Sequence, residues 1–305
     1  MKNKIIFLKP YISQTIWGGK KLSNYNYFCP YNTNGEAWNI SAIPEKSSLI
    51  INKDLENITL LEFFEKNKNF FNNYSKPYPL LTKIIDANDD LSVQVHPNDK
   101  YALKKHNSYG KAECWYVLDC PANSSLIYGH KAKDLDELKK LVDNNEWNNL
   151  LLEKSVNIGD VIYVPPGTIH AIKKNILVFE LQQSSDITYR FYDYDRKDIN
   201  GNKRELHIDD AFNVTYFPQN NLKIIRKSNS SNVLIESEFF KLEKINNNGK
   251  QVYYFPNAQW VQATVINGFG SIDNELISKG STFLVAHNHK FELNGSMELL
   301  ISYIE

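Results

Sequence analysis

The stretch GDVIYVPPGTIHAI, residues 159–172, carries the strongest local structural signals in the chain. Its alternating β-branched and aromatic residues predict a strand that ends at the two prolines. Pro165 and Pro166 cannot continue a central strand, and Gly167 tolerates the dihedral angles of a tight turn. The next strand is then expected to begin near His170. The pattern therefore predicts a β-rich fold in which a turn positions one imidazole.

A second histidine follows a short predicted strand in LSVQVHPND, residues 91–99. Gln94 and His96 are two residues apart, so both side chains leave the same face of an extended strand. Glu113 is an acid within the apolar run KAECWYVL. Two imidazoles, one carboxylate and one amide form a ligand set that zinc accepts. We therefore predict that Gln94, His96, Glu113 and His170 bind one Zn²⁺; ordinary half-buried histidines beside a paired carboxylate are the alternative.

The overall composition argues for a folded protein without a charged or membrane-bound partner. Among 305 residues, 35 Lys and Arg balance 35 Asp and Glu, so no global field attracts nucleic acid or an anionic membrane. No apolar run approaches the ~20 residues of a membrane helix, and the N-terminal apolar stretch is too short for a signal peptide. Three cysteines, Cys29, Cys114 and Cys120, do not suggest a disulfide framework. These features predict a cytoplasmic protein.

Short alternating segments between residues 91 and 183 are bounded by Gly, Pro, Asn or Asp, which is typical of antiparallel strands in a sandwich or barrel. Helical patterns interrupt them at residues 59–67, where Thr59 and Glu62 form a capping-box pattern, and at residues 133–154 and 206–217. A polar connection covers residues 218–232, and short strands are again predicted beyond it. We therefore expect a first domain over residues 1–218 and a second over residues 219–305.

The second region is interpreted as a repeat that has lost its metal ligands. In the alignment of the two regions, Phe291 stands at the position of His170. His287 and His289 form an H-x-H pair, but no acidic or imidazole partner follows at a suitable spacing. We expect no metal in this region.

Seven motifs in the same order resemble the short bacterial form of the type I mannose-6-phosphate isomerases. They are IWGGKKL, GEAWNIS, PLLTKIIDA, LSVQVHPND, KAECWYVL, VPPGTIHAI and ELQQSSDITYRFYDYDR. The resemblance is strong over residues 6–217 and weak beyond them. It implies a cupin fold with two jelly-roll barrels, one bound zinc, and interconversion of mannose 6-phosphate and fructose 6-phosphate. The ligands that it implies are the four residues already selected on chemical grounds.

Three further residues are candidates for the chemistry. Lys111 lies two residues before Glu113 and is expected on the same strand face, where its ammonium group would lie beside the metal. By resemblance, Asp186 matches a position proposed for acid–base work, and Arg190 one proposed for substrate charge. A guanidinium group binds a phosphate or an enediolate through two parallel hydrogen bonds. The alternative for this charged stretch is a solvated ladder of salt bridges.

Three more residues are candidates for binding the substrate. Ser92 precedes Gln94 by two residues and could donate a hydrogen bond to phosphate, although an ordinary strand serine is an equal interpretation. Trp17 and Lys20, in the first motif, are predicted to line the pocket, with simple packing as the alternative for the tryptophan.

An aldose–ketose isomerisation moves a proton between C2 and C1 through an enediol, so it requires a base near the carbons and positive charge near the oxygens.

Two other functions fit parts of the pattern. Two histidines and one carboxylate are also the ligands of non-haem iron oxygenases, and a sugar-phosphate sensor without catalytic activity could retain the pocket. The predicted partner is a small sugar phosphate, with no nucleic acid and no membrane, and the oligomeric state is left open.

Overall fold

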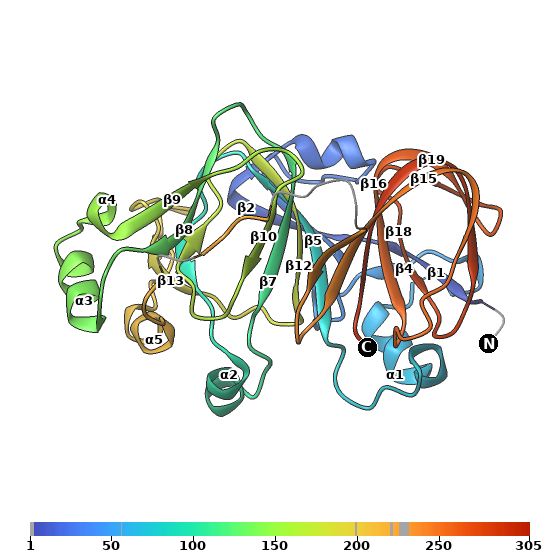
Figure 1. Cartoon of the computed structure of the whole chain (residues 1–305), viewed down its shortest axis with the longest axis horizontal. Coiled ribbons are helices and arrows are strands. Elements are labelled where there is room, and N and C mark those ends of the chain that lie inside the picture. The colour runs from blue at the N-terminus through green and yellow to red at the C-terminus, as the bar shows by residue number, and fades with distance from the viewer. Residues whose placement is uncertain (1–2, 56, 199, 220–221, 226–231) are drawn as a thin grey trace.

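The computed structural model describes residues 3–55, 57–198, 200–219, 222–225 and 232–305, and its regular structure is mainly antiparallel β. Figure 1 shows two groups of strands side by side, with helices at their margins. The predicted β-rich cupin architecture is therefore confirmed. None of the helices in the described ranges is both long and apolar enough to cross a bilayer. The cytoplasmic location stays a prediction.

The first group of strands consists of two sheets. One has the order β10-β7-β12-β5-β2-β3 and the other the order β13-β6-β11-β8-β9. The six strands of the first sheet are β10 (Val161–Val164), β7 (Glu113–Asp119), β12 (Ile176–Gln183), β5 (Leu80–Ala87), β2 (Tyr11–Gly19) and β3 (Asn34–Ile40). The five strands of the second are β13 (Tyr189–Tyr192), β6 (Val93–Val95), β11 (His170–Ala171), β8 (Ser125–His130) and β9 (Leu151–Ser155). Buried residues from both sheets, such as Trp115 and Tyr128, form one core between them.

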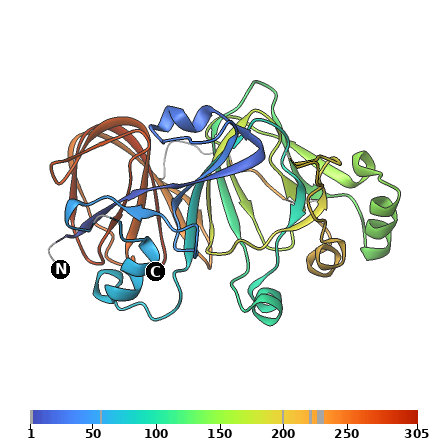
Figure 2. The same cartoon turned by 180° about the vertical axis from the view of Figure 1, so that it is seen from behind.

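The second group is built on one sheet with the order β14-β15-β19-β16-β18-β1-β4, and β17 pairs with β16. Its strands are β14 (Val233–Glu236), β15 (Lys241–Tyr253), β16 (Val261–Ile272), β17 (Glu275–Ser278), β18 (Thr282–Val285), β19 (Phe291–Tyr303), β1 (Ile5–Lys9) and β4 (Leu49–Ile50). The N-terminal β1 and β4 thus belong to a sheet formed mainly by the C-terminal region. Figure 2 shows the blue N-terminal β1 beside the red and orange C-terminal strands, in line with its pairing to β18. The domain division after residue 218 stays a prediction.

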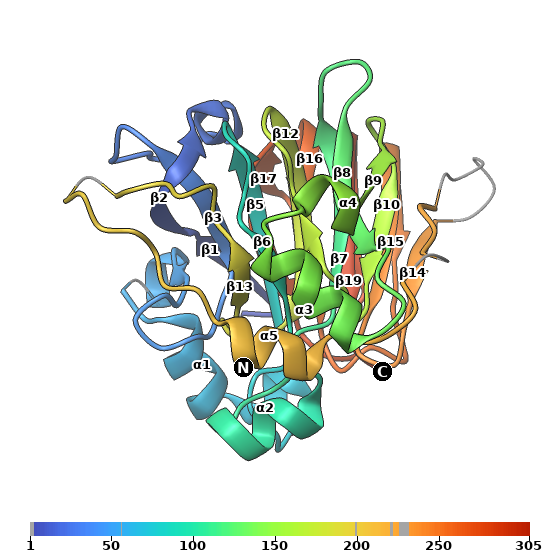
Figure 3. The ribbon, with the colours of Figure 1, turned by 90° about the vertical axis from the view of Figure 1, so that its left-hand side faces the viewer.

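The predicted helices are present within the expected segments. They are α1 (Leu60–Lys66), α3 (Leu135–Asp143), α4 (Trp147–Leu150) and α5 (Ile208–Val214), and short 3₁₀ turns cover Lys21–Tyr25, Lys53–Leu55 and Lys68–Phe71. The capping box at α1 is confirmed, because Thr59 Oγ1 accepts from the Glu62 backbone N–H and the Thr59 N–H donates to the Glu62 carboxylate. In Figure 3, α3 and α5 lie in front of β13 and β6, and their apolar faces pack on that sheet.

Helix α2 (Asp99–His106) was not predicted from the sequence. Asn98 caps it by accepting a hydrogen bond from the Tyr101 backbone N–H. Ala102 is the only buried residue of this helix, so its apolar periodicity is too weak to reveal it.

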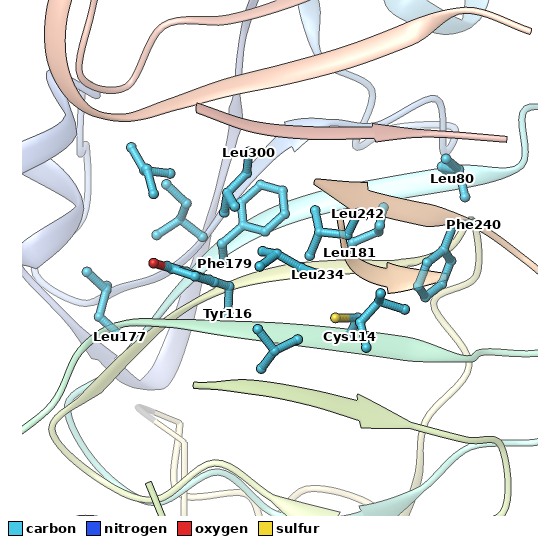
Figure 4. Packing of buried hydrophobic residues seen from close by; sticks show 14 of the residues in the cluster. Leu80, Cys114, Tyr116, Leu177, Phe179, Leu181, Leu234, Phe240, Leu242 and Leu300 are labelled. Carbon is cyan, nitrogen blue, oxygen red and sulfur yellow. The ribbon is translucent and has the colours of Figure 1, made fainter. Parts of the chain in front are cut away.

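The two groups of strands are called the first and the second barrel below. The alternation of side chains on β7 and β12 explains how one sheet packs against the interior of the first barrel and against the second barrel. Cys114 and Tyr116 point outward with Phe179 and pack against the second barrel, whereas Glu113 and Trp115 point into the first. Figure 4 shows the outward cluster, in which residues of both barrels interdigitate. Its labelled members are Leu80, Cys114, Tyr116, Leu177, Phe179, Leu181, Leu234, Phe240, Leu242 and Leu300. All three cysteines are free, as expected.

Candidate metal centre

The sheet order brings three predicted site residues to one level of the first barrel. Gln94 on β6 pairs with His170 on β11 on one side and with Arg190 on β13 on the other. His96 follows Gln94 by two residues, just beyond the end of β6. Glu113 begins β7 in the other sheet. The turn at Pro165 and Gly167 is fixed to this region, because the Gly167 backbone N–H donates to the His96 carbonyl oxygen at 2.8 Å.

His96, Glu113 and His170 form a buried cluster whose potential ligand atoms lie within 4.8 Å of one another. Nε2 of His96 is 3.2 Å from Oε1 of Glu113, and Nε2 of His170 is 3.4 Å from Oε2. The side chains of all three residues are at most 1% exposed. Gln94 lines the same cavity. The structure thus brings three of the predicted ligands together, and the fourth, Gln94, lines the adjoining cavity with Glu113.

Hydrogen bonds fix the orientation of both imidazole rings. Nδ1 of His96 is 3.0 Å from the Ile187 carbonyl oxygen, and Nδ1 of His170 is 2.9 Å from that of Thr168. Because a carbonyl oxygen only accepts hydrogen bonds, each neutral ring carries its proton on Nδ1 and presents the Nε2 lone pair. Both Nε2 atoms and Oε2 of Glu113 are buried without a hydrogen-bond partner. Converging buried atoms of this kind fit a metal ion, which would satisfy all of them.

The charges in the cluster also fit a metal. Burial lowers the pKa of His96 to about 3, assisted by the positive charge of Lys111, and burial lowers the pKa of His170. Burial opposes ionisation of Glu113, but the positive charge of Lys111 holds the pKa of that carboxyl well below its usual range. The cluster therefore offers two neutral nitrogens and one carboxylate, which are the protonation states that metal binding requires.

A cavity of about 240 Å³ opens beside the cluster. Of the predicted catalytic and substrate residues, five line it: Trp17, Ser92, Lys111, Asp186 and Arg190. Lys20 does not line this cavity, contrary to the prediction. It lines a separate hollow with Gly18, Gly19 and Asp86. Lys111 places Nζ 3.0 Å from Oε1 of Glu113, so the two side chains meet as expected, although β7 begins only at Glu113 and Lys111 precedes it.

Asp186 and Arg190 enter the cavity in different states of pairing. Asp186 accepts from Lys46 Nζ at 2.6 Å. Burial opposes its ionisation, but Lys83 and Lys46 lower the pKa of its carboxyl. Arg190 forms no ion pair within the described ranges, and its Nε is buried without a hydrogen-bond partner. Burial and the nearby Arg204 lower the pKa of its guanidinium. A half-buried, unpaired cation in a cavity is suited to binding an anion.

Several further charged residues line the cavity, and none of them was assigned to the site from the sequence. Lys83 Nζ lies 3.5 Å from Glu36 and 3.2 Å from Glu180, and it is 3% exposed. Burial opposes its charge, but the two carboxylates raise its pKa. Trp115 Nε1 donates to Glu180 at 2.9 Å. A single charged residue within an apolar strand was the signal that identified Glu113, and it could also have identified Lys83 and Glu180.

The second barrel has no comparable cluster among its described residues. His287 Nδ1 is hydrogen-bonded to the Ala258 carbonyl oxygen, and His289 lies 3.3 Å from Asp273. Each histidine thus has its own local partner.

This fold and cluster define a cupin with a candidate metal centre. Comparisons with known proteins identify the family. The family described as "Phosphomannose isomerase type I, catalytic domain" matches residues 5–119. The mannose-6-phosphate isomerase of Streptococcus mutans is 38% identical over 98% of both chains, and the mannose-6-phosphate isomerase ManA of Bacillus subtilis is 37% identical over the full length of both.

Solved structures agree. The mannose 6-phosphate isomerase from Bacillus subtilis superimposes with a TM-score of 0.92 at 36% identity, covering 99% of this chain and 100% of that one. A putative mannosephosphate isomerase from Archaeoglobus fulgidus gives a TM-score of 0.81 at 20% identity over 99% of this chain and 98% of that one, a likeness of fold. The chain belongs to the type I phosphomannose isomerase family, and it is an enzyme of the isomerase class.

Proposed function

We propose that this protein interconverts mannose 6-phosphate and fructose 6-phosphate through an enediol, at a zinc ion held by Gln94, His96, Glu113 and His170. The relatives named above carry mannose-6-phosphate isomerase in their names. The observation that supports the proposal most is the buried His–Glu–His cluster, whose ligand atoms converge beside a cavity.

Zinc suits this donor set better than the hard cations do, because two of the donors are imidazole nitrogens. When bound, the ion supplies positive charge close to the sugar oxygens on which negative charge develops. The protein supplies orientation, since the Nδ1 hydrogen bonds hold both rings with Nε2 toward the cavity.

Arg190, Lys111 and Asp186 are proposed to carry the rest of the chemistry. Arg190 is free to bind an anionic group of the substrate, because no carboxylate of the described chain pairs with it. Lys111 adds positive charge beside the metal ligand Glu113, which favours a negatively charged oxygen of the enediolate. Asp186, kept ionised by neighbouring lysines, is positioned in the cavity to accept and return a proton. Ser92 and Trp17 are proposed to contact the sugar phosphate.

The proposal is tested by converting mannose 6-phosphate in D₂O with the zinc-loaded protein. We expect fructose 6-phosphate that carries deuterium at C1, because a proton removed by a protein base exchanges with solvent before it is returned. Product with complete retention of the substrate hydrogen would favour a direct hydride shift over the enediol route. Absence of isomerisation, or consumption of oxygen by an iron-loaded form, would contradict the proposed function itself.

A further inference from the structure

The cations that line the cavity differ in how their charge is balanced. Each lysine has a carboxylate of the cavity itself: Lys46 pairs with Asp186, Lys83 with Glu36 and Glu180, and Lys111 with Glu113. The arginines do not. Arg190 has no ion pair within the described ranges, and the partner of Arg204 is Asp193, which does not line the cavity.

Asp193 fixes Arg204 in place from outside the cavity. Its Oδ2 accepts from Arg204 Nε at 2.7 Å, and its Oδ1 accepts from Nη2. Asp193 is 5% exposed, so this two-bond contact is shielded from water and restricts the guanidinium to one orientation. The third nitrogen, Nη1, has no partner among the described residues.

The single carboxylate of Asp193 is shared by two guanidinium groups. Arg196 Nη2 lies 2.6 Å from its Oδ1, the oxygen that Arg204 also contacts. Arg190 and Arg204 line the same cavity, and burial together with the charge of Arg204 lowers the pKa of Arg190. Like charges in a partly buried cavity repel each other, and a bound dianion would relieve this repulsion. The arginine side of the cavity therefore carries a surplus of positive charge, whereas the lysine side is neutralised.

We propose that Arg204, anchored by Asp193, binds the phosphoryl group of the substrate together with Arg190 and so determines the preference for phosphorylated sugars. This assignment rests on the proposed function, in which the sugar end of the substrate lies at the metal cluster. Two guanidinium groups match a phosphate dianion through several charge-assisted hydrogen bonds, which a lysine cannot provide in the same geometry.

The matched control for this proposal is Arg196. Arg196 carries the same charge and contacts the same carboxylate, and it also lies near Asp89, but it does not line the cavity. Arg204→Ala and Arg196→Ala therefore remove equal charge from the Asp193 cluster at different distances from the substrate. Arg204→Gln retains a hydrogen-bonding group on a shorter, uncharged side chain and serves as a second, less disruptive variant.

The experiment measures two constants for inorganic phosphate with the zinc-loaded enzyme. One is its inhibition constant as a competitive inhibitor, and the other is its dissociation constant, measured by calorimetry. Loss of a charge-assisted contact predicts that Arg204→Ala and Arg204→Gln raise both constants by ~10-fold or more, and raise KM for mannose 6-phosphate more than they lower kcat. Arg196→Ala should change each value by less than about 3-fold.

Two results would overturn the assignment: phosphate binding by the Arg204 variants that equals wild type, or an equal loss in Arg196→Ala. Calorimetry needs no turnover, so it separates this inference from the proposed function. If the wild-type protein fails to isomerise mannose 6-phosphate, the function is rejected, while the phosphate titration still decides the role of Arg204.

Discussion

Nζ of Lys111 lies 3.0 Å from Oε1 of Glu113, and the two side chains are 6% and 1% exposed. The same carboxylate faces His96 and His170, so this lysine is adjacent to the candidate metal ligands without being able to serve as one of them while protonated. A buried cation at this position stabilises the ionised form of Glu113, and its ammonium group also lines the cavity, where it can contact a substrate oxygen.

Lys111→Met tests this relationship, because it retains the approximate length of the side chain and removes the charge. We expect kcat/KM for mannose 6-phosphate to fall by ~10²-fold or more while one zinc per chain is retained. Lys105→Met is the control, since Lys105 pairs with Asp210 and is 45% exposed. Steady-state kinetics with metal analysis of both variants checks the expectation, and wild-type kinetics in Lys111→Met would contradict it.

Arg190→Ala should lower kcat/KM by at least ~10²-fold, because it removes a charge-assisted contact to the substrate from a largely desolvated site. Arg190→Lys should retain part of the activity, since it keeps the charge but loses the planar fork. Kinetics that match wild type in Arg190→Ala would remove this residue from the site.

The junction between the barrels predicts a large effect on stability. Phe179 is 1% exposed and packs in the cluster that joins β12 to the second barrel. Phe179→Ala should lower the free energy of unfolding by about 3–5 kcal/mol, through lost burial and the cavity left behind. Phe269→Ala should cost far less, because Phe269 is 74% exposed. Denaturant titrations of both variants compare the two, and equal costs would contradict this description of the junction.

The Asp193 cluster predicts a particular dependence of stability on pH. Burial opposes the charge of Asp193, but hydrogen bonds from Arg204 and Arg196 hold the pKa of its carboxyl below its usual range. The unfolded chain therefore binds this proton at a higher pH, near ~3.9, than the folded chain does. The contribution of the Asp193 carboxylate to the free energy of unfolding is complete above that pH. It is lost as the pH falls through the pKa that Asp193 has in the folded protein.

Asp193→Asn should accordingly reduce the free energy of unfolding by about 2 kcal/mol near neutral pH. The difference from wild type should shrink as the pH falls below ~4, where the wild-type carboxylate becomes protonated. Chemical denaturation at a series of pH values measures this difference. A difference that stays constant down to pH ~2 would show that the charge of Asp193 does not stabilise the folded protein.

Local signals predicted much of the fold and the metal cluster. Pro165, Gly167 and His170 lie in one continuous stretch, and the two-residue spacing of Gln94 and His96 is enough to give them a common face. The capping box at Thr59 is equally local. These features depend on neighbouring residues, and the sequence displays them directly.

Features that depend on pairing between distant strands were missed. Glu180 lies between Lys83 on β5 and Trp115 on β7 because of the register of three strands, which no local pattern specifies. Arg204 lines the cavity while Asp193, on another segment, accepts a hydrogen bond from its Nε. Lys20 failed to line the cavity although Trp17, three residues earlier, does. Membership of a motif therefore did not determine the direction of a side chain.

The most direct test of the account is to remove and restore the metal while isomerase activity is followed. We predict that treatment with a chelator abolishes conversion of mannose 6-phosphate to fructose 6-phosphate, and that one equivalent of Zn²⁺ per chain restores it in the wild-type protein but not in His170→Ala. Full turnover by metal-free protein, or equal restoration of the variant, would contradict a zinc site at Gln94, His96, Glu113 and His170.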